Sequence, residues 1–270
     1  MKIISLLFLS FFIILIQSDA HCVDIKLLQA VENNNRKKEN TIRDKYRNPE
    51  RTLKFFGIQP EMNVVEILPG RGWYTEILSF YLKNDGNLTV ASFGKDHPNK
   101  YLSKMHNNFK KYFEKKSQIF GSFNIVKFKK NNNYIPDIKS DSQDLVLTFR
   151  NSHNWLNNDN IDDIYNSINR VLKKNGILGV VQHRAEDFKN PYLSSKKGYI
   201  PESFLINLIE KKGFKLIEKS EINSNQLDTK NYPKGVWTLP PTLRLENKNK
   251  KKYLKIGESD RMTLKFKKVN

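Results

Sequence analysis

A glycine turn after an acidic residue is the first feature of this chain that could bind a ligand. The segment reads Val65-Glu66-Ile67-Leu68-Pro69-Gly70-Arg71-Gly72. Two glycines one residue apart at a strand-to-helix turn let a ligand approach the backbone closely. The acid at Glu66 can hydrogen-bond a cationic or hydroxyl group. Taken alone, Gly70 and Gly72 fit a plain tight turn as well as a nucleotide-like ligand.

A second polar group follows a strand-like run at 145–149. Its members are Arg150, Asn151, His153, Asn154 and Trp155. His153 sits in a polar run rather than on an apolar face, which makes it a candidate base or substrate ligand. Arg150 could bind an anionic substrate group through paired hydrogen bonds. Trp155 is either an aromatic wall of a pocket or a core residue.

His183 and Arg184 follow another strand-like run, at 177–182. If the two strands are neighbours, His153 and His183 face one pocket, together with Arg150 and Arg184. The alternative for both arginines is an ion pair with an acid of the chain: Asp144, Glu186 or Asp187.

The sequence gives little support for a metal site or a disulfide. His153 and His183 with Glu186 or Asp187 could hold a metal, but no short-motif spacing supports this. Cys22 is the only cysteine, which excludes a disulfide framework within the chain and any cysteine-cluster metal site. We therefore predict no metal.

Strand-like and helical segments alternate along most of the chain. Strand-like runs cover 64–68, 88–93, 124–128, 145–149, 177–182, 215–220 and 262–266, and helical patterns lie near 74–82, 100–116, 162–173 and 202–212. This alternation predicts an α/β fold with a doubly wound, mostly parallel sheet. Ligands bind such sheets beyond the carboxyl ends of the strands, where the strand order reverses. The polar groups above follow such strand ends.

The sequence predicts one α/β domain at 58–270, preceded by an N-terminal helical extension at 21–57. Arg43, Tyr46 and Arg47 share one helical face of the extension. This face either caps the pocket or is simply solvated. The segment 224–252, rich in Asn, Lys and Pro, is expected to be a long ordered excursion rather than a helix.

The N-terminus resembles a secretory signal peptide. Met1-Lys2 is followed by an apolar run from Ile3 to Ile16 and by small residues before a cut after Ala20. The run is short for a spanning helix. We therefore expect residues 1–20 to be removed and the mature protein to be periplasmic or secreted, without stable membrane insertion. An uncleaved anchor is the alternative, and a lipoprotein at Cys22 is disfavoured by His21.

The net charge of +19 invites a polyanion partner, but the composition argues against one. Only 10 of the 47 basic residues are arginines, and the lysines are scattered through the whole chain. A binding surface would concentrate them and use more arginine. We predict no specific nucleic-acid partner, and the sequence gives no oligomeric state.

The order of acid, glycine turn, helix and strand resembles the class I S-adenosylmethionine-dependent methyltransferases. The resemblance covers residues 63–268 and implies a seven-stranded, Rossmann-like sheet. More narrowly, the chain is similar to a bacterial family of exported proteins described as predicted methyltransferases. Besides the glycine turn, the strings that carry this resemblance are Arg43-Asp44-x-Tyr46-Arg47-x-Pro49, Phe55-Phe56-Gly57, Trp73-Tyr74-Thr75-Glu76, Leu147-Thr148-Phe149-Arg150-Asn151-x-His153-Asn154-Trp155, Gly179-Val180-Val181-x-His183-Arg184, Gly235-Val236-Trp237-Thr238-Leu239-Pro240-Pro241-Thr242-Leu243-Arg244 and Gly257-Glu258-Ser259-Asp260-Arg261-Met262.

The resemblance implies S-adenosylmethionine as the cofactor and assigns roles to the polar groups. The implied cofactor-binding residues are Glu66, Gly70, Gly72, Trp73 and Asp96. The implied substrate-binding residues are Arg150, Asn151, Asn154, Trp155, His183 and Arg184, with His153 as the catalytic base for a protonated nucleophile. For Trp73, packing under the helix is the alternative.

Two departures from the methyltransferase pattern bear on the cofactor. Leu68 stands where the first glycine of the motif is expected. The second strand ends at Phe93 without the acid that usually holds the ribose hydroxyls, so Asp96 is the nearest candidate, with a solvated loop acid as the alternative. We expect an exported methyltransferase acting on a small, anionic acceptor. The alternative is a non-catalytic exported small-molecule-binding protein of the same fold, and a weaker third is a surface polyanion binder.

Overall fold

The structure is a computed structural model, and it describes residues 24–129 and 133–269. The signal peptide predicted at residues 1–20 and Cys22 lie outside the described residues. Among the residues described, no helix is both long and apolar enough to cross a bilayer.

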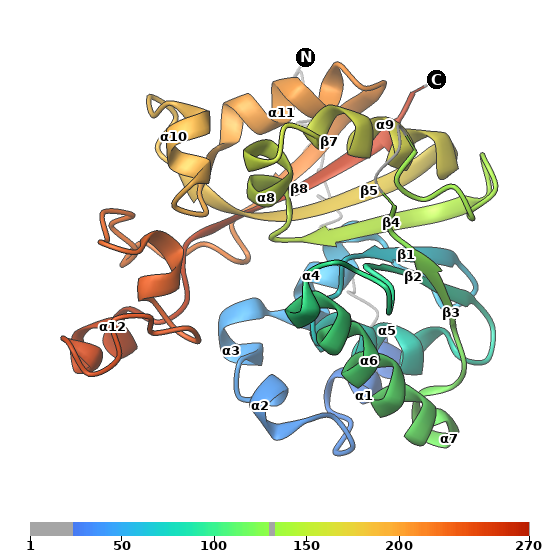
Figure 1. Ribbon diagram of the computed structural model, residues 1–270. Coiled ribbons are helices and arrows are strands. Elements are labelled where there is room, and N and C mark those ends of the chain that lie inside the picture. The colour runs from blue at the N-terminus through green and yellow to red at the C-terminus, as the bar shows by residue number, and fades with distance from the viewer. Residues whose placement is uncertain (1–23, 130–132, 270) are drawn as a thin grey trace, which may run out of the picture.

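A central sheet organises the molecule (Figure 1). Its strands run in the order β3-β2-β1-β4-β5-β8-β7. Neighbouring strands are parallel from β3 to β5, whereas β8 is antiparallel to both β5 and β7. The strands are β1 (Asn63–Ile67), β2 (Asn87–Ser92), β3 (Asn124–Lys127), β4 (Gln143–Phe149), β5 (Leu172–Ala185), β7 (Phe214–Ser220) and β8 (Arg261–Lys268), and the two-residue β6 (Ile200–Pro201) pairs with β5 off this path. The predicted doubly wound, mostly parallel α/β sheet is confirmed.

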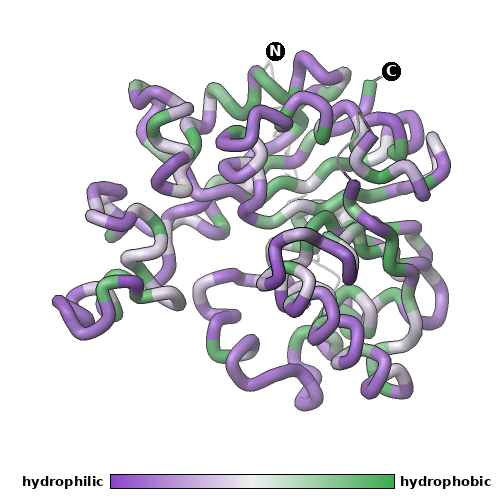
Figure 2. Tube along the Cα trace, viewed as in Figure 1, coloured by the Kyte–Doolittle hydropathy of each residue, from purple (hydrophilic) through white to green (hydrophobic). Residues whose placement is uncertain are grey.

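Helices cover both faces of the sheet (Figure 1). One layer holds α8 (Ser152–Asn157), α9 (Ile161–Val171), α10 (Pro191–Ser195) and α11 (Glu202–Glu210). The other holds α1 (Ile25–Val31), α4 (Pro49–Phe56), α5 (Trp73–Leu82), α6 (Lys100–Lys115) and α7 (Ser117–Phe120). Figure 2 shows hydrophobic residues gathered along the central strands. Each face therefore has its own apolar core.

Strand alternation sends neighbouring residues of one strand into different cores. In β4, Leu145 and Leu147 pack with the layer of α1 and α5, whereas Val146 packs with the layer of α9 and α11. Successive side chains of a strand point to opposite faces of the sheet. This is why the interior strands read as unbroken apolar runs in the sequence.

The N-terminal extension contributes to the core of the α/β domain. Leu27 of α1 and Phe56 of α4 are buried in the same cluster as α5. Between them lie the short helices α2 (Lys38–Thr41) and α3 (Asp44–Arg47). The residue after α4, Gly57, has φ +78°, a left-handed conformation that ends the helix.

The segment 224–252 is an ordered excursion, as predicted. It contains a 3₁₀ turn at Gly235–Thr238 and the start of α12 (Lys250–Ile256). Both lie at the left in Figure 1, beyond the sheet and beside α3. Val236 packs on Tyr199 and Ala185 near the end of β5, which places Trp237 close to the carboxyl edge of the sheet.

Candidate functional site

A cavity of about 250 Å³ lies at the carboxyl ends of β1 and β4, where the strand order reverses. In open α/β sheets this is where ligands bind. Its lining comes from the extension, the glycine turn, the residues after β4, the end of β5 and the excursion. The lining residues are Arg47, Glu66, Leu68, Pro69, Gly70, Trp73, Tyr74, Phe149, Arg150, Asn151, His153, Asn154, His183 and Trp237. We call this the central cavity.

The two glycines of the turn have different surroundings. Gly70 has φ +63°, and a Cβ added there would meet no atom within 4 Å. Gly72 has φ +84°, but its Cβ would lie 2.7 Å from Cε2 of Phe113. Leu68, at the place of the missing first glycine, has φ +48° and is left-handed without being glycine. The open backbone toward a ligand is therefore that of Gly70, whereas Gly72 permits close packing of α6.

Glu66 carries a buried carboxyl group at the cavity wall. Its Oε2 accepts a hydrogen bond of 2.6 Å from the hydroxyl of Thr75. Burial raises the pKa of Glu66 to about 8, although the bond from Thr75 acts in the opposite direction. A cationic ligand group beside this carboxyl would favour its ionised form.

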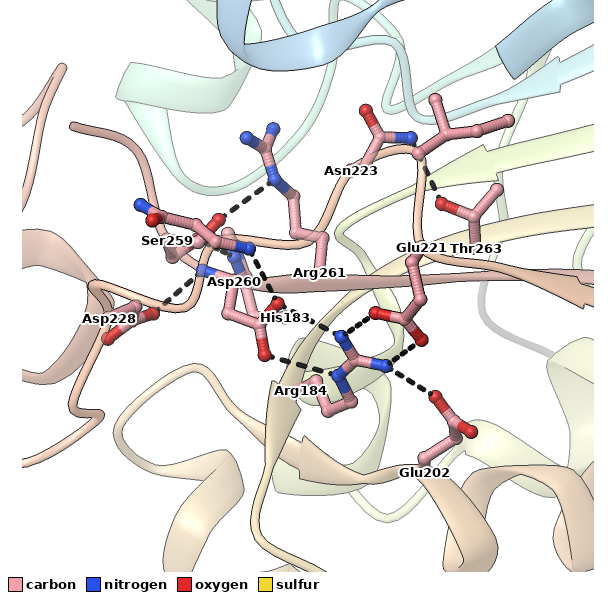
Figure 3. A network of polar contacts seen from close by, with 12 residues as sticks. His183, Arg184, Glu202, Glu221, Asn223, Asp228, Ser259, Asp260, Arg261 and Thr263 are labelled. Atoms are coloured by element: carbon pink, nitrogen blue, oxygen red, sulfur yellow. Dashed lines mark hydrogen bonds and ion pairs between the residues drawn. The ribbon is translucent and has the colours of Figure 1, made fainter. Parts of the chain in front are cut away.

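The two histidines meet in the central cavity, with their ring centres 5.7 Å apart. His153 lies on α8, and its Nδ1 contacts the side-chain amide of Gln182. His183 lies on β5, and its Nδ1 contacts the hydroxyl of Ser259 (Figure 3). Burial lowers the pKa of His153 to about 4 and holds the pKa of His183 well below its usual range. Both rings are therefore neutral at physiological pH, and burial disfavours their protonated forms.

Besides His153, three residues after β4 line the central cavity, but Trp155 does not. Asn151 donates hydrogen bonds to the carbonyl of Ile67 and to the hydroxyl of Thr148, which fixes the end of β4 against β1. Arg150 and Asn154 line the cavity. Trp155 is buried in the core beside Tyr165, with ring centres 5.5 Å apart. Of the two roles predicted for Trp155, pocket wall and core residue, the structure shows the second.

Arg184 is the clearest correction to the sequence-based site. It does not line the central cavity, and its guanidinium group bonds three carboxylates, those of Glu202, Glu221 and Asp260 (Figure 3). The hydrogen bonds that Arg184 donates, to Glu221 first and then to Asp260, raise the pKa of Arg184. The ion-pair alternative holds for this residue, although with partners other than those named from the sequence.

Asp96 also lies elsewhere than the resemblance implied. It is exposed after β2 and forms an ion pair with Lys127, 3.2 Å between Nζ and Oδ2. Asp96 does not line the central cavity, nor the adjoining cavity that is lined by Arg43, Arg47 and Arg150. The acids named for a metal are engaged as well, Glu186 with Lys230 and Asp187 with Ser203. Within 24–129 and 133–269 no group of residues has the makeup of a metal site.

Sequence reasoning missed several lining residues. Tyr74 and Phe149 stack at 3.6 Å with an interplanar angle of 10°, forming one wall. The ring of Trp237 lies edge-on to that of His153, with the ring centres 5.9 Å apart. Arg47 was not missed, because it lines the cavity from α3, as one of the two alternatives for its shared face with Arg43 predicted. No signal in the sequence marked Tyr74 and Trp237 as lining residues, because an aromatic side chain is ordinarily expected in the core.

Solved structures share this arrangement of strands and helices. A SAM-dependent methyltransferase from Aquifex aeolicus is 17% identical, with a TM-score of 0.56 over 84% of this chain and 93% of that protein. A geranyl diphosphate methyltransferase in complex with SAM is 10% identical, with a TM-score of 0.57 over 90% of this chain and 95% of that protein. The cyclase SpnF is 12% identical, with a TM-score of 0.55 over 83% of this chain and 81% of that protein.

These similarities concern the fold. No protein-family model and no curated protein matches the chain, so the narrower resemblance to exported bacterial proteins stays a prediction. The cyclase among the similar structures shows that this fold is not limited to proteins named as methyltransferases. The described residues therefore have the fold of class I SAM-dependent methyltransferases.

Proposed function

We propose that this protein is a S-adenosylmethionine-dependent methyltransferase acting on a small molecule. The observation that carries the proposal is the central cavity itself. At the reversal of strand order it combines the open backbone of Gly70, the buried carboxyl of Glu66 and the neutral imidazole of His153. Similar structures include a methyltransferase in complex with SAM.

The residues present fit one end of the cofactor better than the other. Glu66 can pair with a cationic group, and nothing near Gly70 blocks a close approach to its backbone. Bound there, S-adenosylmethionine would supply an electrophilic methyl group. At the ribose end the expected carboxylate is absent from the cavity wall, because Asp96 is exposed and paired with Lys127. The proposal therefore rests on the glycine turn and Glu66.

The chain's own part in methyl transfer is mostly to position the reactants. Holding a nucleophile in line with a methyl group supplies much of the rate enhancement of such a reaction. The stacked Tyr74 and Phe149 give the cavity a rigid wall. His153 lines the cavity as a neutral ring and is the candidate to accept the proton of a hydroxyl or amine acceptor, although burial makes it a weak base. His183, 5.7 Å away, is the neighbouring neutral ring.

Calorimetry with S-adenosylmethionine and S-adenosylhomocysteine tests the proposal directly. We expect both to bind at micromolar to millimolar concentration, with one site per chain. Absence of binding by either at millimolar concentration would refute the proposed function. Turnover is then tested by following S-adenosylhomocysteine release in the presence of small carboxylate- or phosphate-bearing acceptors.

A non-catalytic binding protein of the same fold is the second candidate. Two observations favour it, the left-handed Leu68 in place of the first glycine and the exposed position of Asp96. It predicts that a small molecule binds in the central cavity while S-adenosylhomocysteine does not compete for it.

Export is part of the proposal, and it rests on the N-terminal sequence alone. Cleavage after Ala20 would leave His21 at the mature N-terminus. N-terminal sequencing of the protein recovered from its native compartment tests this, and recovery with residues 1–20 still attached would contradict cleavage.

A further inference from the structure

Four arginines surround a single carboxylate beside the central cavity. Arg43 and Arg47 come from the extension, Arg150 from the end of β4 and Arg261 from the start of β8. The carboxylate of Glu258 forms ion pairs with Nε of Arg43, at 2.6 Å, and with Nε of Arg47, at 3.1 Å. It forms a third ion pair with Nη1 of Arg261, at 3.2 Å. We call these four arginines with Glu258 the arginine cluster.

The positive charge of the cluster is not balanced. Burial alone would raise the pKa of Glu258, but Arg47, Arg261 and Arg43 lower it to about 2, so this one carboxylate is ionised at neutral pH. Arg150 forms no ion pair with any residue of the described part of the chain. Four guanidinium groups therefore stand against one carboxylate.

Hydrogen-bond donors of the cluster are also left over. Nη2 of Arg43 and Nη2 of Arg47 are buried and have no partner among the residues described. The side chain of Arg47 is only 3% exposed. Its guanidinium carbon lies 4.8 Å from the ring centre of Trp73, which holds the group in place. Buried donors without acceptors cost free energy, so such a site is expected to have an acceptor that the chain does not supply.

The arginines that carry these unpartnered donors line two cavities. Arg47 and Arg150 line the central cavity, and with Arg43 they line an adjoining cavity of about 540 Å³. The two cavities share Pro69, Gly70 and Trp73. Lys37 and Arg71 add positive charge to the adjoining cavity, where Glu39 is the only acidic lining residue.

We infer that Arg43, Arg47 and Arg150 form a subsite for a carboxylate or phosphate group of the methyl acceptor. The planar guanidinium fork matches the oxygens of both anions and binds them through paired, charge-assisted hydrogen bonds. The assignment to an acceptor rests on the proposed function, whereas the anion subsite itself does not. Because Arg43, Arg47 and Arg150 line cavities, we expect the anion to be compact.

Calorimetric titration of inorganic phosphate and of succinate into the full-length chain tests the subsite. Each titration is run with and without saturating S-adenosylhomocysteine. We expect at least one anion to bind at millimolar concentration and its affinity to be unchanged by S-adenosylhomocysteine. Displacement of the anion by S-adenosylhomocysteine would mean that the arginines hold the carboxylate of the cofactor, which overturns the assignment to the acceptor.

Variants locate the bound anion. Arg150→Met should weaken anion binding by about tenfold to a hundredfold, as expected for losing a charge-assisted pair of hydrogen bonds. Arg51→Met is the matched control, because Arg51 is exposed on α4 and lines neither cavity. Equal weakening by both variants, or no anion binding by the unaltered protein, would overturn the subsite.

Thermal unfolding separates binding from a structural role. Arg150 has no counter-ion among the described residues, so replacing it with methionine should leave the melting temperature unchanged or raise it in the absence of anion. A lowered melting temperature would indicate a structural role and contradict the proposal. If the methionine variant does not fold, Arg150→Lys keeps the charge without the planar fork and should weaken binding of the anion less. Anion binding that depends on Arg150 in a protein with no affinity for S-adenosylhomocysteine would support the subsite and overturn methyl transfer.

Discussion

Phe113 of α6 packs so closely on Gly72 that no side chain fits between them. The Cβ of an alanine at this position would lie 2.7 Å from Cε2 of Phe113 and would sit on a backbone with φ +84°. Gly70, two residues earlier, has open space at the same place. The second glycine of the pair is therefore required by the packing of α6, and only the first is available to a ligand.

This difference predicts opposite outcomes for the two glycines. Gly70→Asn should change the free energy of unfolding by less than about 1 kcal/mol, because asparagine tolerates a left-handed backbone and meets no neighbour. Its side chain fills the space next to the turn, so affinity for S-adenosylhomocysteine should fall by at least about tenfold. Gly72→Ala should instead destabilise the fold by about 3 kcal/mol through strain and overpacking. Urea unfolding and calorimetry measure the two effects, and an unchanged affinity in Gly70→Asn would refute a ligand at this turn.

Glu66→Gln should stabilise the ligand-free protein at alkaline pH. Burial raises the pKa of Glu66 from 4.5 to about 8, so the folded protein keeps a proton that the unfolded chain releases. The stability that this group contributes is therefore present below pH 4.5 and is lost as the pH rises to about 8, a difference on the order of 5 kcal/mol. Glutamine mimics the protonated form and removes the loss. The free energies of unfolding of both proteins at acidic and alkaline pH test this, and parallel pH profiles would contradict it.

The buried imidazole of His153 predicts a loss of stability on acidification. Its pKa is lowered by burial from 6.5 to about 4, so between these values the unfolded chain binds a proton that the folded protein does not. Stability is retained above pH 6.5 and lost as the pH falls to about 4, with a contribution of about 3 kcal/mol. His153→Asn should show a smaller decrease over this range. Because the pKa of His183 is lowered as well, the double variant should show a smaller decrease again.

Arg184 should matter for stability but not for ligand affinity. Arg184→Met leaves the buried carboxylates of Glu202 and Asp260 with fewer counter-charges and should destabilise the fold by about 3 kcal/mol. Lys219 and Lys230, which also contact these acids, limit the loss. Affinity for S-adenosylhomocysteine and for phosphate should stay within about twofold of the unaltered protein. A selective loss of phosphate binding would return Arg184 to the site.

The sequence determined the sheet and the place of the cavity. The interior strands are buried on both faces, so they appear as short apolar runs, and the alternation of strands with helices predicted the parallel order and the ligand-binding edge. For the same reason Glu66, Gly70, Arg150, His153 and His183 could be named before the fold was known, because each follows or ends a strand.

Only the tertiary structure decided which of two equivalent side chains is free. Arg150 follows β4 and Arg184 lies near the end of β5, at the same edge of the sheet, but the residues opposite them come from distant parts of the chain. Arg184 bonds Glu202, Glu221 and Asp260, whereas Arg150 has no ion-pair partner among the described residues. The availability of a charge depends on which partners packing brings within hydrogen-bond distance, and sequence separation does not encode that distance.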